Sequence, residues 1–443
     1  MSAWLAVLPV LLLGWVLNRL AARGGGPGTI AGVVVWGALA QVTWMTALDL
    51  AGIRWSPPLL FVPAVAVAVA AALAARRGPR HTADSVRAAF ASREWRWGAA
   101  AAVAALAHAV VIAATPAFGW DFRYVWGLKA HAFALAGGHD LAWLSWPPYA
   151  FAHPTYPPLW SDLLAAGATM GATVAATAAA WQAVVAVTLA AGCWACSRGA
   201  AAPARALAAA VGAWSPVVFW PRYSGYAEAL LALLVVAAFC GLDRVAGGET
   251  DAMPTLVASV AALALVKDEG AALALGVALA TVRLVGLRRA VPVVCGFVVP
   301  FASWHLFLLH AGVRQRAYLL SLPLALRHLV DLPASLVAAV KPKFALVALA
   351  GALAAPGLRG PRLRGVRLAL AVWGLAVAGA YLTTTADLTW HLFTSLDRVL
   401  AAPLPAIVAF GLRAGWPAQA TGFGPSEGSS GPGFALDTTG DGL

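Results

Sequence analysis

The first residues whose types could do chemistry form the segment GWDFRYVWGLKAHAF, at positions 119–133. It directly follows an apolar run and places one carboxylate, Asp121, ahead of an arginine, a lysine and several aromatic rings. A carboxylate in such a position can accept a proton from a hydroxyl group and act as a general base. An aspartate at the start of a helix can equally be an N-cap, which only stabilises the helix. The sequence leaves both interpretations of Asp121 open.

A second charged group interrupts the apolar stretch LALVKDEGAAL, residues 263–273. Each flanking arm has only about 15 residues, or roughly 22 Å of helix, against a hydrocarbon core of about 30 Å. Lys267, Asp268 and Glu269 should therefore lie below the membrane surface, where charged groups must face a cavity or one another. A lysine–carboxylate pair that merely closes a hairpin is the alternative. We favour a functional site, because a hairpin can close without charges.

Four further segments offer polar or aromatic side chains that could join such a site. They are SWPPYAFAHPTYPPLWSDLL (145–164) with His153 and Tyr156, PRYSGYAE (221–228) with Arg222, Tyr223, Tyr226 and Glu228, HAGVRQRAY (310–318) with Arg314 and Arg316, and DLTWHLFTSLDR (387–398) with Asp387, Trp390, His391 and Arg398. Each segment is weak by itself, because aromatic side chains also anchor helices at a membrane interface. Together they predict several cations and carboxylates at one membrane surface.

The composition indicates that helices within a membrane position these residues. Of the 443 residues, 61% are hydrophobic and 11% are charged, whereas a soluble domain has about 25% charged residues. The apolar runs are continuous and rich in alanine, leucine and valine, which favours helices over the alternating strands of a barrel. We therefore expect an all-α polytopic membrane protein.

The net charge and the cysteines have plain explanations. The net charge of +12 fits arginine-rich cytoplasmic loops, so we do not expect a nucleic-acid partner. The four cysteines all fall in apolar runs; they are Cys193, Cys196, Cys240 and Cys295. We expect them to be small core residues, without a disulfide framework and without a metal site.

Thirteen apolar runs predict transmembrane spans, and the excess of arginine over lysine is typical of a GC-rich bacterial genome. The predicted location is therefore the bacterial cytoplasmic (inner) membrane. The spans are about 3–20, 30–48, 58–75, 97–116, 172–196, 203–220, 226–242, 252–266, 270–285, 290–310, 336–356, 368–384 and 399–413. Arginines concentrate in 76–97, 283–289 and 357–367, which predicts that these loops face the cytoplasm and that the N-terminus lies outside.

Three regions follow from this topology. Residues 1–96 hold the first transmembrane helices and a basic cytoplasmic loop, residues 97–413 form a transmembrane core with the outer loop 117–171, and residues 414–443 are a disordered tail rich in glycine, serine and proline. Within the outer loop, helical spacing predicts an amphipathic helix over 121–136 that lies in the membrane surface. The residues with this spacing are Phe122, Trp126, Lys129 and Phe133.

The predicted outer face carries most of the acidic residues. Of the 18 in the chain, it holds Asp49, Asp121, Asp140, Asp162, Glu228, Asp268, Glu269, Asp331, Asp387 and Asp397. Mixed charges on short outer segments indicate a polar site that faces outward. The alternative is an ordinary solvated rim with interfacial tryptophan and tyrosine anchors.

The position of Asp121, at the start of the first large outer loop, resembles that of the catalytic aspartate in polytopic glycosyltransferases of the GT-C superfamily, which use lipid-linked sugars. HPTYPPL, KDEG and WHLFTSLDR resemble motifs in bacterial members related to the protein mannosyltransferases and the aminoarabinose transferase. The resemblance covers roughly residues 97–410. In the family the aspartate usually follows the first transmembrane helix, whereas Asp121 follows the fourth predicted span. Residues 1–75 would then be an added unit of three helices.

The resemblance implies transfer of a sugar from a polyprenyl-phosphate donor to an acceptor hydroxyl, on a glycan, a lipid or a protein, at the outer membrane face. It implies that Asp121 is the general base and that cations, for which arginine is well suited, bind the donor phosphate. The candidate phosphate ligands are Lys267, Arg222, Arg314, Arg316 and Arg398. The candidate contacts to the sugar or the acceptor are His153, Tyr156, Asp268, Glu269 and His391.

The sequence does not require a cofactor. There is no Walker-type loop and no Rossmann glycine motif after a strand, so a nucleotide donor has no support. Asp121, Asp162 and Glu228 could hold a divalent cation, although no ligand spacing demands one.

Three functions other than glycosyl transfer remain open for a protein with the GT-C-like core predicted over 97–413. They are a membrane transporter or flippase, an O-antigen ligase or polymerase-like glycan assembly protein, and a non-enzymatic assembly subunit. A transporter should show related halves, and the sequence has no convincing internal repeat. A chemical assay on the purified protein separates the enzymes from the other two.

Overall fold

The computed structural model describes residues 3–21, 30–75, 95–220, 223–313 and 318–417, and these ranges are almost entirely helical. Extended pairing within them is limited to two single bridges, one between Ala200 and Pro417 and one between Tyr318 and Thr384. The tail predicted to be disordered, residues 414–443, lies outside the described residues from position 418 onward.

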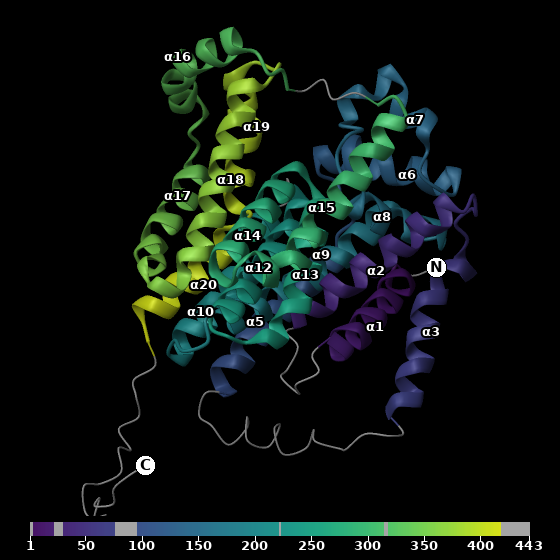
Figure 1. The fold of residues 1–443 in the computed structure, drawn as a ribbon, viewed down its shortest axis with the longest axis horizontal. Helices are drawn as coiled ribbons and strands as arrows, with labels where there is room; N and C mark the ends of the chain where they lie inside the picture. Colours follow the sequence, from purple (N-terminus) through teal and green to yellow (C-terminus); the bar gives the residue numbers. More distant parts are fainter. Residues whose placement is uncertain (1–2, 22–29, 76–94, 221–222, 314–317, 418–443) are drawn as a thin grey trace, which may run out of the picture.

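Figure 1 shows the order of the helices along the chain. The longer helices are α1 (Trp4–Ala21), α2 (Ile30–Leu50), α3 (Pro57–Ala75), α5 (Trp95–Ala114), α9 (Val174–Cys196), α12 (Glu228–Ala246), α13 (Met253–Val266), α14 (Asp268–Val285), α15 (Leu287–His310), α16 (Leu322–Ala339), α17 (Pro342–Ala354), α18 (Arg364–Thr383), α19 (Leu388–Ala401) and α20 (Leu404–Gly415). The shorter ones are α6 (Gly127–Ala136), α7 (Leu141–Ser145), α8 (Leu159–Thr169), α10 (Ala202–Ala213) and α11 (Pro216–Phe219). A π-helical segment forms η1 (Phe122–Trp126). Segments of 3-10 helix form η2 (Pro147–Ala152), η4 (Thr250–Ala252), η5 (Ala355–Arg359) and η6 (Pro361–Leu363).

Several of the described helices are long and apolar enough to cross a membrane. Eight meet this description, namely α1, α2, α5, α9, α12, α15, α16 and α18. The pair α19 and α20, bent by 43° at its junction, would make a ninth span. The other predicted spans fall on α3, α10, α13, α14 and α17. The structure is thus that of an all-α multi-pass membrane protein, as the composition predicted.

Three predicted spans cross breaks between helices. The predicted span 203–220 crosses the break at Trp214 and Ser215, because α10 ends at Ala213 and α11 begins at Pro216. The predicted span 336–356 crosses a break, because α16 ends before the extended residues Val340 and Lys341 and α17 begins at Pro342. Proline has no backbone N–H and suits the first turn of a helix, so it starts a new helix here. The predicted span 399–413 crosses the bend between α19 and α20, where Pro403 precedes the new helix. Helix α16 itself occupies residues that we had assigned to an outer loop.

Helix α12 is the centre of the bundle. Every residue from Glu228 to Leu242 is buried, and the helix packs against α9, α13, α14, α18 and α20. A helix that is apolar around its whole circumference must be covered on all sides. Helix α2 packs against α9, α12 and α13, so the N-terminal helices share the same core. Glu228, the first residue of α12, is therefore a carboxylate at the end of the most buried helix.

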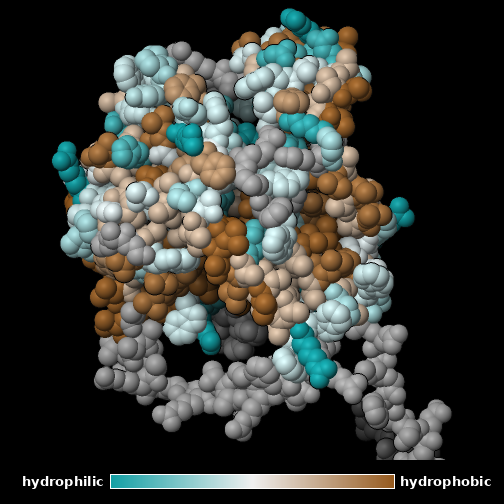
Figure 2. Space-filling model, turned by 180° about the vertical axis from the view of Figure 1, so that it is seen from behind, coloured by the Kyte–Doolittle hydropathy of each residue, from teal (hydrophilic) through white to brown (hydrophobic). Residues whose placement is uncertain are grey.

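The outside of the bundle is largely apolar. Val103, Leu106 and Val110 of α5 are exposed, as are Leu306 and Leu309 of α15. Figure 2 shows hydrophobic side chains gathered around the middle of the face that it draws, with many hydrophilic side chains nearer the top. An exposed apolar band of this kind suits contact with the hydrocarbon chains of lipids.

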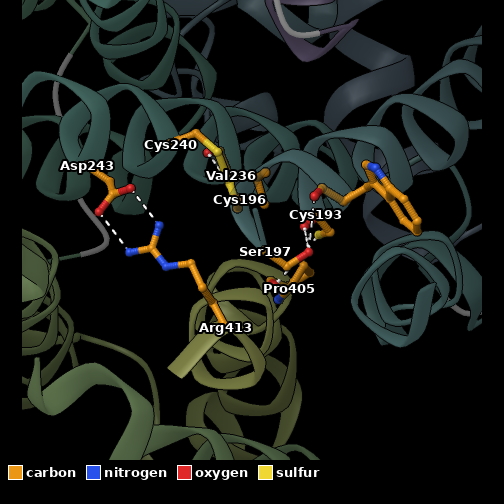
Figure 3. Close-up of a disulfide and its surroundings, with 9 residues drawn as sticks. Cys193, Cys196, Ser197, Val236, Cys240, Asp243, Pro405 and Arg413 are labelled. Atoms are coloured by element: carbon orange, nitrogen blue, oxygen red, sulfur yellow. Dashed lines mark hydrogen bonds and ion pairs between the residues drawn. A yellow bond between two sulfur atoms is a disulfide. The ribbon is translucent and has the colours of Figure 1, made fainter. Parts of the chain in front are cut away.

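A disulfide joins Cys196, at the end of α9, to Cys240 of α12 (Figure 3). The expectation of no disulfide was therefore wrong, because packing of α9 against α12 brings together residues 44 apart in the sequence. Cys193 stays a free, buried core residue. In the same region Arg413 of α20 donates two hydrogen bonds, of 2.7 and 2.9 Å, to Asp243 of α12. These links tie α9, α12 and α20 together.

Candidate active site

Asp121 forms an ion pair with Arg398 of α19. Asp121 precedes the π-helical turn η1, and its side chain makes no capping hydrogen bond. The N-cap alternative is therefore wrong, since the carboxylate ties two distant segments together instead. Burial raises the pKa of Asp121, but the charge and the hydrogen bond of Arg398 outweigh burial and lower this pKa overall. Asp121 is held in its ionised form, and a lower pKa makes it a weaker base.

The turn before α12 holds the backbone of Asp121. The N–H of Asp121 donates a hydrogen bond of 2.9 Å to the hydroxyl of Tyr226. The turn depends on Gly225, which has a φ of +83°, and a side chain there would lie 2.5 Å from the ring of Phe122. Gln182 of α9 accepts the N–H of Gly225 at 2.9 Å. Only glycine combines this backbone conformation with so close an approach.

Lys267, between α13 and α14, forms ion pairs with two carboxylates of the site. Its Nζ lies 2.9 Å from Oε1 of Glu228 and 3.0 Å from Oε1 of Glu269. Lys267 and Glu228 are both almost fully buried. Arg398 extends the chain of charges, because its Nη1 lies 3.4 Å from Oε1 of Glu228. The hairpin-closing alternative explains only the Lys267–Glu269 pair, whereas the contact to Glu228 ties the hairpin to α12.

The loop after η2 brings His153 and Tyr156 to this cluster. Lys129 of α6 is fully buried and donates hydrogen bonds of 3.0–3.3 Å to the carbonyl oxygens of His153, Pro154 and Tyr156. His153 has a φ of +48°, which is uncommon for a residue other than glycine and is kept only where the surroundings enforce it. The rings of His153 and Tyr156 stack with centroids 4.6 Å apart, and the ring of Tyr156 lies 5.8 Å from Nζ of Lys267.

The amphipathic helix predicted over 121–136 is present as η1 followed by α6. The four residues with helical spacing are all buried; they are Phe122, Trp126, Lys129 and Phe133. Helix α6 packs against α8. The spacing thus identified the buried face, and the lysine on that face organises the neighbouring loop rather than facing solvent.

Six of the predicted site residues line one cavity of about 110 Å³, which we name the charged cavity. Its lining is Tyr156, Lys267, Asp268, Glu269, Ala272, Tyr318, Ala376, Val377, Ala380, Tyr381, His391, Ser395, Arg398 and Val399. Three buried polar atoms of this cluster have no hydrogen-bond partner in the described part of the chain: Oε2 of Glu228, Oε2 of Glu269 and Nε of Arg398. Buried polar atoms are normally paired, so these atoms are available to water or to a ligand.

A larger cavity of about 700 Å³, which we name the apolar cavity, lies beside α14 and α15. Its lining is Thr155, Asp268, Ala271, Ala272, Leu275, Phe297, Phe301, His305, Leu308, Leu309 and Val313. Leu309 is also largely exposed on the apolar outside of the bundle. Asp268 and Ala272 line both cavities, so the charged cavity and the apolar cavity are neighbours.

The remaining predicted site residues fall into two groups. Asp121 and His153 flank the charged cavity through Arg398 and Tyr156. Arg222, Arg314 and Arg316 lie outside the described residues. Tyr318, Tyr381 and Ser395 could not be identified from the sequence, because aromatic and small polar residues are common at membrane interfaces. Glu228 carried a usable signal, since a carboxylate that begins a long apolar helix is costly without a partner.

A second polar cluster lies at His139, between α6 and α7. Its Nδ1 is 2.9 Å from Asp49 of α2, and its Nε2 is 3.1 Å from Asp162 of α8. Burial lowers the pKa of His139, but the charges and hydrogen bonds of Asp162 and Asp49 outweigh burial and raise the pKa to about 9. A positively charged imidazolium therefore joins α2, the segment between α6 and α7, and α8. None of the three residues lines the charged cavity or the apolar cavity.

The trio that we considered for a divalent cation does not converge. Asp162 bonds to His139, whereas Asp121 and Glu228 lie against Arg398. Across the described ranges, no group of three histidine, cysteine, aspartate or glutamate side chains is arranged to hold a metal ion.

The fold and the site define a multi-pass α-helical membrane protein with a charged cavity beside an apolar one. No protein-family model matches this chain, and no curated protein or solved structure matches it either. Its function must therefore be argued from the geometry of the site.

Proposed function

We propose that this protein is a glycosyltransferase that moves a sugar from a polyprenyl-phosphate donor to an acceptor hydroxyl. The observation that carries the proposal is the meeting of the charged cavity and the apolar cavity at Asp268 and Ala272. A polyprenyl-phosphate sugar has the same two parts, namely a polar anionic head and a long apolar chain. A ligand of only one kind would use only one of the two cavities.

The charged cavity supplies the groups that the donor head requires. Lys267 and Arg398 carry positive charge for the phosphate, and Nε of Arg398 is a buried donor without a partner in the described residues. His391, Glu269 and Tyr156 offer hydrogen bonds to sugar hydroxyls. Arg222, Arg314 and Arg316 remain proposed phosphate ligands on the strength of the sequence.

The apolar cavity suits the isoprenoid chain next to the phosphate. Phe297, Phe301 and Leu308 line it, and Leu309 connects it to the apolar outside of the bundle. Because lipid tails are as apolar as these side chains, an isoprenoid chain can pass from the bilayer into the cavity without contact with water. A donor that is anchored in the membrane also explains why the cavity pair lies between apolar helices.

The finer topology is part of the proposal. It comprises thirteen spans, an N-terminus outside, a GT-C-like core over 97–413 and a site at the outer face of the bacterial cytoplasmic membrane. The support is the arginine-rich loops at 76–97 and 357–367. The acceptor would be a glycan, a lipid or a protein.

A transfer assay tests the proposed function. The purified protein in lipid nanodiscs would be incubated with a panel of polyprenyl-phosphate monosaccharides carrying labelled sugars, with a bacterial membrane extract as the acceptor source. We expect one donor to lose its label to an acceptor and to leave polyprenyl phosphate. A short-chain polyprenyl phosphate should also bind more tightly than the matching polyprenyl alcohol, which lacks the phosphate. If no donor in the panel is used, or if proteoliposomes carry the intact donor across the bilayer, the protein is not this enzyme.

A further inference from the structure

Among the described residues, Asp268 differs from the other carboxylates of the cluster in forming no ion pair. Asp121 is paired with Arg398, Glu228 with Lys267 and Arg398, and Glu269 with Lys267. Asp268 makes no side-chain hydrogen bond and no ion pair with any residue that the structure describes. An ionised carboxylate away from bulk water normally has a partner. Within the described part of the chain, Asp268 is therefore the carboxylate of the cluster in which neither oxygen has a protein partner.

Asp268 also has the most central position for a ligand that spans both cavities. It lines the charged cavity beside Lys267 and the apolar cavity beside Thr155. In a donor that spans both, the link between chain and head would lie near Asp268. The anomeric carbon of a polyprenyl-phosphate sugar is only one oxygen atom away from the phosphorus. The reacting carbon would therefore lie close to this carboxylate.

Asp121 lacks both of these properties. It lines neither the charged cavity nor the apolar cavity, and its carboxylate is already bonded to Arg398. Its ion pair suits Asp121 to orient the guanidinium of Arg398, and Arg398 does line the charged cavity. A carboxylate that must first break an ion pair is a poorer proton acceptor than one that is free.

We propose that Asp268 is the general base of the transfer and that Asp121 is a positioning residue that orients Arg398; this inference rests on the function proposed above. The acceptor hydroxyl oxygen forms a bond to the anomeric carbon of the donor. The bond from that carbon to the phosphate oxygen breaks, and its electron pair stays on the phosphate. The hydroxyl proton passes to the carboxylate of Asp268. Lys267 and Arg398 balance the charge that the phosphate gains.

The experiment compares Asp268→Asn and Asp121→Asn, with the labelled donor that the wild-type protein uses. Loss of a general base reduces kcat by about 10²–10⁴-fold, so Asp268→Asn should lose kcat to this extent with a donor KM within a few-fold of wild type. Asp121→Asn should instead raise the donor KM, because Arg398 is less well held, and should keep most of kcat. In a plot of kcat/KM against pH, the fall at low pH (the acid limb) should be absent from Asp268→Asn and present in Asp121→Asn.

The outcomes separate the two proposals. A wild-type protein that transfers no sugar contradicts the proposed function itself. A wild-type protein that transfers sugar while Asp268→Asn keeps its kcat and its acid limb overturns the role of Asp268. Loss of kcat in Asp121→Asn alone returns the base to Asp121. The matched control is Asp331→Asn in α16, an exposed aspartate that lines neither cavity and should behave as wild type.

A second variant, Asp268→Glu, tests the assignment if Asp268→Asn does not fold. Asp268→Glu keeps the charge and moves the carboxylate outward by one methylene group. A base that must reach one proton should lose at least about tenfold in kcat on such a displacement, with the donor KM little changed. An unchanged kcat in Asp268→Glu, with a melting temperature like that of wild type, would also argue against the assignment.

Discussion

Arg398 and Asp121 form an ion pair across 277 residues of sequence. The guanidinium of Arg398 also lies 3.4 Å from Glu228 and 5.4 Å from the ring centroid of Tyr226, whose hydroxyl accepts the N–H of Asp121. One side chain of α19 therefore connects the segment after α5 with the start of α12. The geometry of the charged cavity depends on this connection.

The first prediction concerns the coupling of this pair. Removing one partner of a buried ion pair costs about 3–5 kcal/mol, and the cost should be smaller here because the two side chains are 13% and 18% exposed. Arg398→Met should lower the melting temperature more than Asp121→Asn, since it also removes the guanidinium that lies 3.4 Å from Glu228. The double variant should lose less stability than the sum of the two single variants. The measurement is a thermal melt of the four proteins in one detergent.

The control for this cycle is an exposed pair on α16. Arg327 and Asp331 lie 3.8 Å apart and are 79% and 52% exposed, so Arg327→Met should change the melting temperature little. Strictly additive losses for Arg398 and Asp121 would mean that the two side chains do not interact in the folded protein.

A glycine substitution tests the turn that holds Asp121. Gly225 and Gly171 have φ of +83° and +84°, but a side chain at 225 would meet the ring of Phe122 at 2.5 Å, whereas nothing lies within 4 Å at 171. Gly171→Ala should cost about 1 kcal/mol for the backbone strain alone. Gly225→Ala should cost clearly more and should also weaken donor binding, because Phe122 and Asp121 must move. Equal losses of stability in the two variants would show that the Phe122 contact has no energetic weight.

The pH dependence of stability should report on His139. Its pKa is about 9 in the folded protein and 6.5 in the unfolded chain, so its contribution is complete below about pH 6.5 and disappears as the pH rises through about 9. The groups that face it are Asp49 of α2 and Asp162 of α8, with Lys129 of α6 close to Asp162. Lys129 has a pKa lowered to about 7, chiefly by burial, and acts in the opposite direction, so the effect of His139 is a wild-type melting temperature that falls relative to His139→Gln between pH 7 and pH 9.5. An equally steep change in the two proteins would assign the effect to other groups.

Labelling with an impermeant maleimide in intact cells tests the proposed orientation. A cysteine at Ser145, which is exposed before η2, should react from outside. A cysteine at Arg198, exposed between α9 and α10, should react only after the cells are opened. The background protein should carry Cys295→Ser, because Cys295 is a free exposed thiol. The reverse pattern would put the charged cavity on the cytoplasmic side and remove the proposed donor from its reach.

Local patterns in the sequence predicted a good part of the structure. Continuous apolar runs dictated membrane helices, because no other structure satisfies the backbone hydrogen bonds of a single segment within lipid. The spacing of Phe122, Trp126, Lys129 and Phe133 predicted the buried face of the helix after Asp121. The short arms around Lys267 predicted that its charge is buried, and it is. Each inference needed only neighbouring residues.

Helix boundaries and the cysteine pair were harder to predict. Hydropathy averages over a window and so missed the break after α16 and the 43° bend before α20, both of which a single proline accompanies. The Cys196–Cys240 disulfide depends on which helices pack side by side, and hydropathy says nothing about that choice.

By itself, the sequence determined that this protein is a bundle of membrane helices with charged residues at Asp121, Lys267 and Arg398. The tertiary structure alone decided which charges meet. It joined Asp121 to Arg398 and Lys267 to Glu228, and it left Asp268 without an ion pair to any described residue where the two cavities adjoin. The physical reason is that apolar periodicity defines the buried face of each helix, whereas the partner of a buried charge is set by the rotation and depth of helices that are distant in the sequence.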